Sequence, residues 1–338
     1  MSIDGGPWTT DDGQTGRLWS AAFWMARATL VTLLLAVAAC QAGINPPAGL
    51  AQPEPASAIP EPSPSPGPSV TLALLGDVML GRAVHPSAET FAYLEPFLAS
   101  ADLVLANLES PLTNAPVQTE SPYALCAPPE NVKYLADAGF DLVALANNHS
   151  LDCGPEGLAE TQSTLQDAGL GFIGPEPEPV YRVINGIRLA FLAFDATSGF
   201  DIETAAQAVR SAREAGAMVI LSIHWGAEYQ AGASSSQKQI AGQLAEAGAG
   251  LIWGHHPHVL QPAEWIRDGK TLVLNSLGNA LFDQYGLENT RRSVLVLVRL
   301  GEGGVQELQV IPFLIDFRNS RIVEAGADDA QVIMKYFK

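Results

Sequence analysis

The hydrophobic pattern divides the chain into three parts. An apolar run covers residues 28–39, a proline-rich stretch extends to residue 69, and short apolar runs then alternate with amphipathic segments. Short apolar runs predict buried strands, and apolar residues recurring every three or four positions predict helices. The predicted strands are Val70–Leu75, Leu103–Ala106, Leu142–Ala146, Gly171–Ile173, Tyr181–Ile184, Arg188–Phe194, Met218–Ile223, Gly250–Trp253, Ala263–Arg267, Thr271–Asn275, Ser293–Arg299 and Val305–Phe313. The predicted helices are Thr90–Ser100, Pro129–Ala138, Gly157–Ala168, Ile202–Ala215, Ser236–Ala247 and Ala327–Lys338.

The order of these elements indicates the fold class. Up to residue 253 strands and helices alternate, which is typical of a parallel sheet with crossover helices. After residue 263 the strands follow one another across short turns such as Arg267-Asp268-Gly269-Lys270, which predicts antiparallel hairpins. The pattern therefore favours an α/β sandwich of two packed sheets with outer helices.

The N-terminal region has the features of a targeting segment. Met25-Ala26-Arg27 precedes an apolar run that is too short to span a bilayer as a stable helix and is typical of a signal peptide. Three aspartates upstream suit such a segment badly, so we interpret Met25 as the true start. The run ends in Val37-Ala38-Ala39-Cys40, which resembles a bacterial lipobox whose cysteine carries acyl chains. An uncleaved apolar anchor is the alternative, and both readings predict a membrane-anchored body outside the cytoplasm of a bacterium.

Three regions follow from this reading. Residues 1–40 form the signal region with its lipobox, and residues 41–69, which are rich in Pro, Ala, Ser and Glu, form a disordered, extended tether. Residues 70–338 form the globular domain. The hydrophobic content of 47% is ample for a core, and a net charge of −18 argues against a nucleic-acid partner.

Two cysteines lie within the predicted globular domain. In an oxidising compartment Cys126 and Cys153 are candidates for a disulfide. A buried free thiol or a soft metal ligand is the alternative for each of them.

Polar side chains stand where several predicted strands end. The segment Gly254-His255-His256-Pro257-His258 follows one apolar run, and His224, His149, Asp77 and Glu109 follow others. Ligands bind at the carboxyl ends of parallel strands, and imidazole and carboxylate groups are common metal ligands. The pattern predicts a metal centre at this edge. The alternatives are a surface histidine cluster and isolated core histidines.

Six short segments, in the same order, resemble the CapA family of poly-γ-glutamate capsule biosynthesis proteins, which is similar to the calcineurin-like metallophosphoesterases. They run from Asp77 to Asp283 and cover most of the predicted globular domain. The segments are Gly76-Asp77-Val78-Met79-Leu80-Gly81-Arg82, Asn107-Leu108-Glu109-Ser110-Pro111-Leu112, Ala146-Asn147-Asn148-His149-Ser150-Leu151-Asp152, His224-Trp225-Gly226-Ala227-Glu228-Tyr229, Gly254-His255-His256-Pro257-His258-Val259-Leu260-Gln261 and Ser276-Leu277-Gly278-Asn279-Ala280-Leu281-Phe282-Asp283.

The resemblance implies a four-layer α/β/β/α sandwich of metallophosphoesterase type that holds one or two divalent ions of manganese, iron or zinc. Asp77 and His258 match ligands of the first metal, and Glu109 matches the bridging acid. The implied second-metal ligands are Asn148, His224 and His256. His149 matches a catalytic acid or transition-state contact. Residues implied to orient the ligands are Asp152, Glu228 and Asn279. His255 is the odd histidine of its segment, and it is left with either a structural or an orienting role.

Arg82 follows Asp77 closely and could hold a phosphate or carboxylate through a bidentate contact. A surface cation is the alternative. Three positions depart from the family patterns. Met79 stands where the phosphoesterases have a histidine, Glu109 stands where they have an aspartate, and Ala280 replaces an aromatic residue. The first metal site therefore has fewer protein ligands.

The sequence thus supports a membrane-tethered metal-dependent hydrolase of phosphoesterase type, linked by the resemblance to capsule synthesis or export. Its expected partners are a phosphoester substrate or an anionic polymer, and membrane proteins of polymer synthesis. The alternative is a non-catalytic accessory or polymer-binding component of the envelope machinery. A surface lipoprotein with a decayed site is a third reading, and the retention of the whole ligand set argues against it.

Overall fold

The computed structural model describes residues 67–338. The signal region, the lipobox with Cys40 and residues 41–66 of the predicted tether lie outside the described residues. The first element, β1 (Ser69–Val78), begins one residue before the predicted domain boundary. Within residues 67–338, no helix combines the length and the apolar character needed to cross a membrane.

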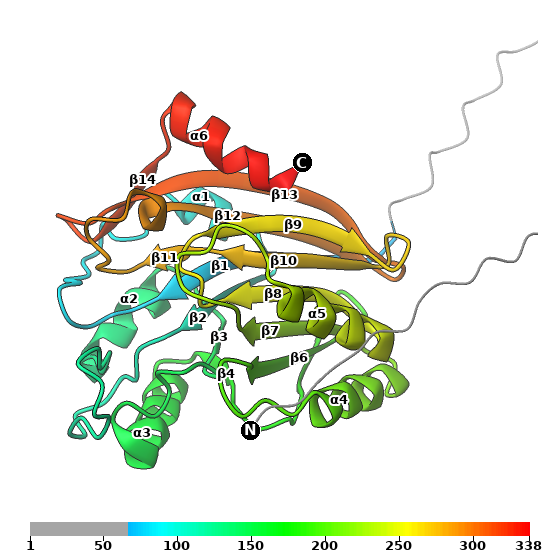
Figure 1. Ribbon diagram of the computed structural model, residues 1–338, viewed down its shortest axis with the longest axis horizontal. Coiled ribbons are helices and arrows are strands. Elements are labelled where there is room, and N and C mark those ends of the chain that lie inside the picture. The colour runs from blue at the N-terminus through cyan, green and yellow to red at the C-terminus, as the bar shows by residue number, and fades with distance from the viewer. Residues whose placement is uncertain (1–66) are drawn as a thin grey trace, which may run out of the picture. The chain divides into compact units, whose positions relative to one another are not determined.

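Two sheets form the centre of the protein (Figure 1). The larger sheet has the order β14-β13-β12-β1-β2-β3-β4, and β11 also pairs with β1. The strands β1 to β4 are parallel to one another, whereas β12, β13 and β14 run antiparallel to their neighbours. The strands that join β1 are β2 (Leu103–Leu108), β3 (Leu142–Ala144), β4 (Gly171–Ile173), β11 (Asn279–Leu281), β12 (Arg292–Gly301), β13 (Gly304–Asp316) and β14 (Arg321–Glu324).

The second sheet has six strands in the order β5-β6-β7-β8-β10-β9. Its four central strands are parallel, and β5 and β9 are antiparallel edge strands. The predicted hairpins are therefore present, but β10 also pairs in parallel with β8. The strands are β5 (Val180–Ile184), β6 (Ile187–Asp195), β7 (Met218–His224), β8 (Ala249–His255), β9 (Leu260–Ile266) and β10 (Thr271–Leu277).

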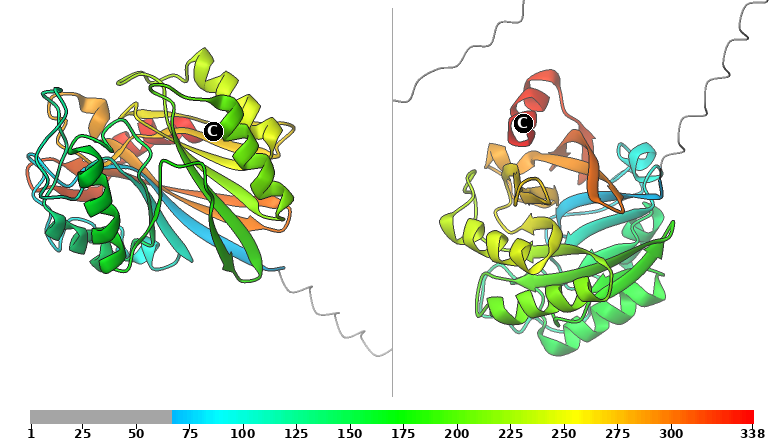
Figure 2. Two further views of the ribbon diagram at one scale, coloured as in Figure 1. Left: turned by 90° about the horizontal axis from the view of Figure 1, so that it is seen from below. Right: turned by 90° about the vertical axis from the view of Figure 1, so that its right-hand side faces the viewer.

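Helices cover the outer face of each sheet (Figure 2). One outer layer contains α1 to α3, and the other contains α4 and α5. This arrangement confirms the four-layer α/β/β/α sandwich. The helices are α1 (Glu95–Leu98), η1 (Pro129–Asn131), α2 (Val132–Asp137), α3 (Gly154–Asp167), α4 (Ile202–Glu214), α5 (Ser235–Ala247), η2 (Glu288–Arg291), α6 (Ala327–Ile333) and η3 (Met334–Phe337).

The alternation of side chains along β1 explains its continuous apolar run. Leu72 and Leu74 pack between the two sheets, whereas Ala73 and Leu75 pack under the outer helices. Successive residues of a strand point to opposite faces, so a strand covered on both faces needs apolar residues at every position. This packing fixes the ends of β1 and its neighbours, and the polar residues at those ends form the site described below.

Several elements differ from the sequence-based expectations. The helix predicted at Thr90–Ser100 contains only the four residues of α1. The segment before it is held in turns because Thr90 donates its hydroxyl to the Ser320 carbonyl and its own carbonyl accepts a bond from the Ile322 amide. Helix α3 begins three residues earlier than predicted, with a proline in its first turn, where proline is favoured. The short strands β11 and β14 were not predicted, and their lengths of three and four residues explain why.

Candidate metal centre

Residues from both sheets meet at the carboxyl ends of their parallel strands. Asp77 is the penultimate residue of β1, Glu109 follows β2, and His224 is the last residue of β7. His256 and His258 lie in the loop after β8. The arrowheads of these strands point the same way in Figure 1. The polar residues that end the strands are therefore brought together, as the sequence predicted.

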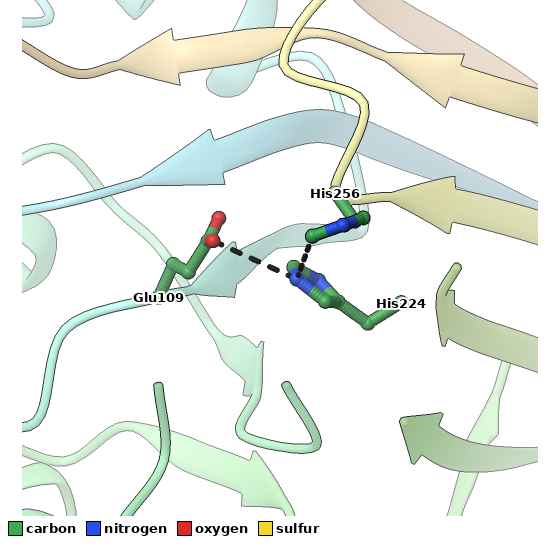
Figure 3. A group of neighbouring side chains, drawn as sticks. All are labelled: Glu109, His224 and His256. Carbon is green, nitrogen blue, oxygen red and sulfur yellow. Dashed lines mark hydrogen bonds and ion pairs between the residues drawn. The ribbon is translucent and has the colours of Figure 1, made fainter. Parts of the chain in front are cut away.

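Glu109 lies at the centre of the site. Its Oε1 atom lies 3.6 Å from His224 Nε2, 3.7 Å from His258 Nε2 and 3.9 Å from His149 Nε2. Figure 3 shows Glu109, His224 and His256 directed toward one another. Among residues 67–338, neither buried oxygen of Glu109 has a hydrogen-bond partner. Because burying an unpartnered carboxylate is costly, this residue marks a position suited to a cation.

Two groups of metal-ligand atoms share this carboxylate. One group is Glu109, His224 and His256, the other is Asp77, Glu109 and His258, and within each group the atoms lie within 4.8 Å of one another. Two nitrogen ligands about 2.1 Å from one ion lie roughly 3 to 3.5 Å apart. His224 Nε2 and His256 Nδ1 are 3.1 Å apart. The donors therefore fit divalent metal ions, and the mixed nitrogen and oxygen set suits manganese, iron or zinc.

Hydrogen bonds from the surrounding residues orient these donors. His258 Nδ1 lies 2.9 Å from Asn279 Oδ1, which leaves its Nε2 facing Glu109. Asn107 donates its side-chain amide to Asp77 Oδ1 at 2.9 Å. His255 Nδ1 lies 3.1 Å from the same Asp77 oxygen. The bond between Asn279 and His258 lies behind this ring and can fix its direction toward the metal position, whereas an orienting role for His255 stays a prediction.

The two carboxylates have opposite pKa shifts. Burial alone raises the pKa of Asp77, but the hydrogen bonds and charges of His255 and His258 hold it well below its usual range. Burial raises the pKa of Glu109 well above its usual range, and the charge of His258 only partly opposes this. The two acids thus meet different environments although they lie in one cluster.

The histidines also differ. Burial lowers the pKa of His224 well below its usual range and lowers that of His256 to a smaller extent. Burial acts in the same direction on His258, but the charges of Glu109 and Asp77 raise its pKa to about 9. His224 and His256 are therefore favoured in the neutral form that binds metals. The adjacent carboxylates favour the protonated form of His258 instead.

The backbone is strained where the ligands leave β8. His256 and His258 have φ angles of 92° and 55°, in a region that glycine normally occupies. Such conformations cost of order 1–3 kcal/mol each for other residues and persist at functional sites. The amide of His256 donates to Asp77 Oδ2 at 3.3 Å, which ties this loop to β1. The segment thus holds two imidazoles at a fixed position between the sheets.

Two glycines permit the close approach of the backbone at this point. A Cβ atom at Gly76 would lie 1.8 Å from the Gly278 carbonyl oxygen, and one at Gly254 would lie 2.2 Å from the Asn275 carbonyl oxygen. Both glycines directly precede site residues. They allow β1 and β8 to pack against the segment around β10 and β11, and so they place Asp77 and His255 next to each other.

His149 lies at the edge of the cluster and is held from behind. Its Nδ1 atom lies 2.8 Å from Asp152 Oδ2, and the same oxygen accepts a bond from the amide of Leu125 at 2.8 Å. The contact favours the tautomer in which Nδ1 donates to the carboxylate, and it leaves Nε2 directed toward the cluster. An orienting role for Asp152 stays a prediction.

A cleft of about 450 Å³ opens beside the cluster. The predicted catalytic residues Arg82 and His149 line it, together with the predicted ligand Asn148, and Asn148 itself is exposed. The neighbouring Asn147 is buried and donates to Asn107 Oδ1 at 3.1 Å. A ligand role for Asn148 stays a prediction. The exposed Glu228 also lies on this wall, where it groups with His256 and His258.

Arg82 is paired within the protein. Its Nε atom donates to Asp283 Oδ2 at 3.0 Å, and its Nη2 atom contacts the other oxygen of that carboxylate. Neither of the two readings from sequence, an anion contact or a surface cation, anticipated this partner. Asp283 ends the last of the six family segments, but no role followed for it from the sequence, because its distance of 201 residues from Arg82 is closed only by the fold. Asn107 could have been recognised, since it lies two residues before Glu109 and so shares its face at the strand end.

Two of the departures, Met79 and Ala280, are buried in the core, whereas Glu109 lies at the centre of the cluster. Met79 is fully buried among the apolar residues under the outer helices, and its sulfur accepts from the amide of Gly81. It is therefore directed into the core at a position where the metal pattern has a histidine. Ala280 is also fully buried. Cys126 and Cys153 form a disulfide, which connects the loop before η1 to the segment that carries His149.

Comparison with known proteins identifies the family. The profile of the family described as "Bacterial capsule synthesis protein PGA_cap" matches residues 71–284, which contain every donor of the cluster. The chain belongs to this family. The family has the metallophosphoesterase-like fold, in agreement with the two-sheet sandwich.

This member of the PGA_cap family is similar to proteins of several bacteria. It is 32% identical over 272 residues to "PGA biosynthesis protein CapA" of Bacillus subtilis (strain 168), covering 72% of this chain and 71% of the relative. It is 31% identical over 306 residues to "Capsule biosynthesis protein CapA" of Bacillus anthracis, covering 80% and 73%. It is also 26% identical, over 73% of both chains, to "Probable polyglutamine synthesis accessory protein Rv0574c" of Mycobacterium tuberculosis (strain ATCC 25618 / H37Rv).

A solved structure shares the fold. A hypothetical protein from Thermus thermophilus matches with a TM-score of 0.51 and 18% sequence identity, covering 72% of this chain and 99% of that one. At this identity the likeness concerns the arrangement of the sheets and helices alone.

Proposed function

We propose that this protein is a metal-dependent hydrolase of phosphoesterase type in the bacterial cell envelope, acting in capsule polymer assembly. The observation that carries the proposal is the position of Glu109. Its buried, unpartnered carboxylate is shared by two groups of ligand atoms drawn from both sheets. Packing alone does not explain why this carboxylate is buried there, whereas a role in holding divalent cations would explain it.

The protein residues have distinct roles in this proposal. Asp77, Glu109 and His258 would hold one ion, and Glu109, His224 and His256 would hold the other. When bound, such ions supply Lewis acidity toward a phosphoryl oxygen and lower the pKa of water. The surrounding hydrogen bonds of Asn107 and Asn279 keep the donors in position for this.

His149 is the candidate proton donor to the leaving oxygen, a role that requires protons on both ring nitrogens because Nδ1–H is bonded to Asp152. Its Nδ1 atom is held by Asp152, and its Nε2 atom lies 3.9 Å from Glu109 Oε1, at the edge of the cleft. A ring held in this way presents one fixed nitrogen to a substrate in the cleft. Arg82 lies on the same wall, and its pairing with Asp283 leaves part of its guanidinium free to donate to an anionic group.

The link to the capsule rests on the relatives. The Bacillus subtilis relative is called a PGA biosynthesis protein and the Bacillus anthracis relative a capsule biosynthesis protein. We extend this role to the present chain, with anchoring through Cys40 and a tether that places the domain outside the membrane. Its partners in this proposal are an anionic polymer and the membrane proteins that make it.

A second candidate function is a non-catalytic, polymer-binding role in the same machinery. The observation that favours it is the burial of Met79 in the core, because the first cluster then lacks a histidine that the phosphoesterase pattern supplies. A weakened first site would still allow one ion to hold an anionic chain. The two candidates differ in whether the purified protein turns over a phosphoester.

The test combines metal analysis with hydrolysis. We expect the purified protein to retain divalent metal and to hydrolyse a generic phosphomonoester or phosphodiester in the presence of Mn²⁺. His256→Ala removes one of three donors of a cluster, so its metal affinity should fall by at least about tenfold and its rate by about a hundredfold. His85→Ala is the matched control, because the exposed His85 is the one histidine of six outside the site.

The outcomes separate the candidates. Metal retention without turnover of either substrate would favour the polymer-binding role over the hydrolase. Full metal content in His256→Ala would contradict the assignment of the cluster itself. Equal losses in His256→Ala and His85→Ala would also contradict it, because the effect would then be one of general folding.

A further inference from the structure

A second cavity lies next to the cleft of about 450 Å³ beside the candidate ligands, the metal cleft. It has a volume of about 720 Å³ and is formed by the segment from Tyr285 to Arg291 and by the end of β13 with the turn into β14. Its charged lining consists of Glu288, Arg291, Asp316, Arg318 and Arg321. Neither the sequence patterns nor the roles proposed above account for the three arginines of this arginine cavity.

Tyr285 connects the two cavities. Tyr285 and Leu287 line both of them. The Tyr285 hydroxyl donates to the carbonyl of Ala83 at 3.3 Å, beside Arg82, and lies 3.4 Å from the carbonyl of Phe317, beside Arg318. Its ring also packs edge-on against Phe317 with 5.3 Å between the ring centres. The metal cleft and the arginine cavity are therefore neighbours across a single wall, so one extended ligand can contact both.

The arginines of the cavity are incompletely paired. Arg321 contacts Asp316 at 3.2 Å and Arg291 contacts Glu288 at 3.6 Å. Within residues 67–338, Arg318 forms no ion pair and the buried Nε atom of Arg291 has no hydrogen-bond partner. Buried donors are normally satisfied, so this atom indicates a missing acceptor.

The net charge of the cavity limits what it can bind. Three guanidinium groups and two carboxylates leave a formal charge of +1, in a chain whose net charge is −18. One carboxylate balances this charge, whereas a phosphate dianion would leave an excess of negative charge among acidic neighbours. The planar arginine fork also matches the two oxygens of a carboxylate.

We propose that the arginine cavity is a subsite that binds a carboxylate of an extended acidic chain whose next part lies in the metal cleft. Arg318 and Arg291 provide the contacts to the carboxylate, and Tyr285 forms the wall over which the chain passes. The connection to catalysis rests on the proposed function, but the binding of a carboxylate chain by this cavity does not.

The test uses a purified γ-linked glutamate oligomer as the probe and the full protein. Oligomer affinity is measured by calorimetry at low ionic strength for wild type, Arg318→Gln and Arg291→Gln. Each substitution removes charge-assisted hydrogen bonds, so the affinity should fall about tenfold. Arg299→Gln is the matched control, because Arg299 is 39% exposed against 36% for Arg291 and pairs with Glu307 at the far end of β12. It should change the affinity less than twofold.

Two results would overturn the proposal. One is equal oligomer affinity in wild type, Arg318→Gln and Arg291→Gln. The other is that tripolyphosphate, but not the glutamate oligomer, depends on these arginines, because the cavity would then select phosphate. His256→Ala keeps this test separate from the proposed function, since arginine-dependent oligomer binding that persists without the metal supports the subsite even if no hydrolysis is found.

Discussion

At the residue scale, glycines decide whether the ligands can meet. Gly254 precedes the histidines at the end of β8, and the space for its Cβ is filled by the Asn275 carbonyl oxygen and by Trp225 Nε1 at 2.6 Å. Trp225 in turn donates from that nitrogen to the Asn275 carbonyl at 2.9 Å. Any side chain at Gly254 must therefore push β8 away from β10 and move the imidazoles that follow.

We expect Gly254→Ala to lower the free energy of unfolding by about 3 kcal/mol, because a methyl group would overlap backbone and indole atoms. Gly250→Ala in the same strand is the control, since the nearest atom to its Cβ would lie 3.6 Å away, which is ordinary contact. Chemical denaturation of both variants measures the difference. Equal stability of the two would mean that β8 has more freedom than the close contacts indicate.

At the element scale, one loop supports His149, the candidate proton donor. Asp152 holds His149 through its side chain, and its carbonyl accepts from the amides of Gln118 and Thr119 at 2.8 and 3.1 Å. The disulfide between Cys126 and Cys153 closes the same loop over a separation of 27 residues. The loop and the turn that carries His149 are therefore one connected unit.

Replacing both cysteines by alanine should cost about 3 to 4 kcal/mol, because the unfolded chain then gains the freedom of an open loop of this length. Hydrogen exchange of residues 118–125 should rise at the same time, while the metal content should stay unchanged, since no donor of the cluster lies on the loop. Thermal denaturation of the wild type with and without reductant measures the loss of stability when the disulfide is opened. An unchanged unfolding temperature under reduction would contradict this account.

At the scale of the whole molecule, the donors of the candidate metal centre come from both sheets. Asp77 and Glu109 come from strands of the larger sheet, and His224, His256 and His258 come from strands and loops of the smaller one. A ligand that binds only the folded state stabilises it in proportion to the logarithm of its concentration. Metal binding should therefore stabilise the sandwich as a unit rather than one sheet of it.

Mn²⁺ at a hundred times its dissociation constant should raise the free energy of unfolding by about 2.7 kcal/mol. Glu109→Gln should lose most of this gain, because both groups of donors share the carboxylate. Glu307→Gln is the control, since this exposed side chain lies on β13 away from the cluster. Calorimetric scans with Mn²⁺ and with a chelator compare the three proteins, and an equal shift in all of them would place the stabilising ion elsewhere.

Local patterns were sufficient for the central strands, for most of the helices and for the types of residue at the strand ends. The apolar runs located the central strands because strands buried on both faces exclude polar residues, and polar residues such as Asp77 and His224 marked where burial stops. The segment from Gly254 to His258 likewise indicated the metal centre. The prediction of a helix from Thr90 was wrong because the turn there is held by Ser320, more than two hundred residues away.

The sequence by itself determined that strands would end in metal-binding side chains, because hydrophobic period and residue chemistry are local properties. Only the tertiary structure decided which of these side chains meet. It placed Glu109 between the histidines, paired Arg82 with Asp283, and set the arginine cavity beside the metal cleft. Those contacts depend on how two sheets pack, and the packing sums many weak interactions between residues far apart in the chain.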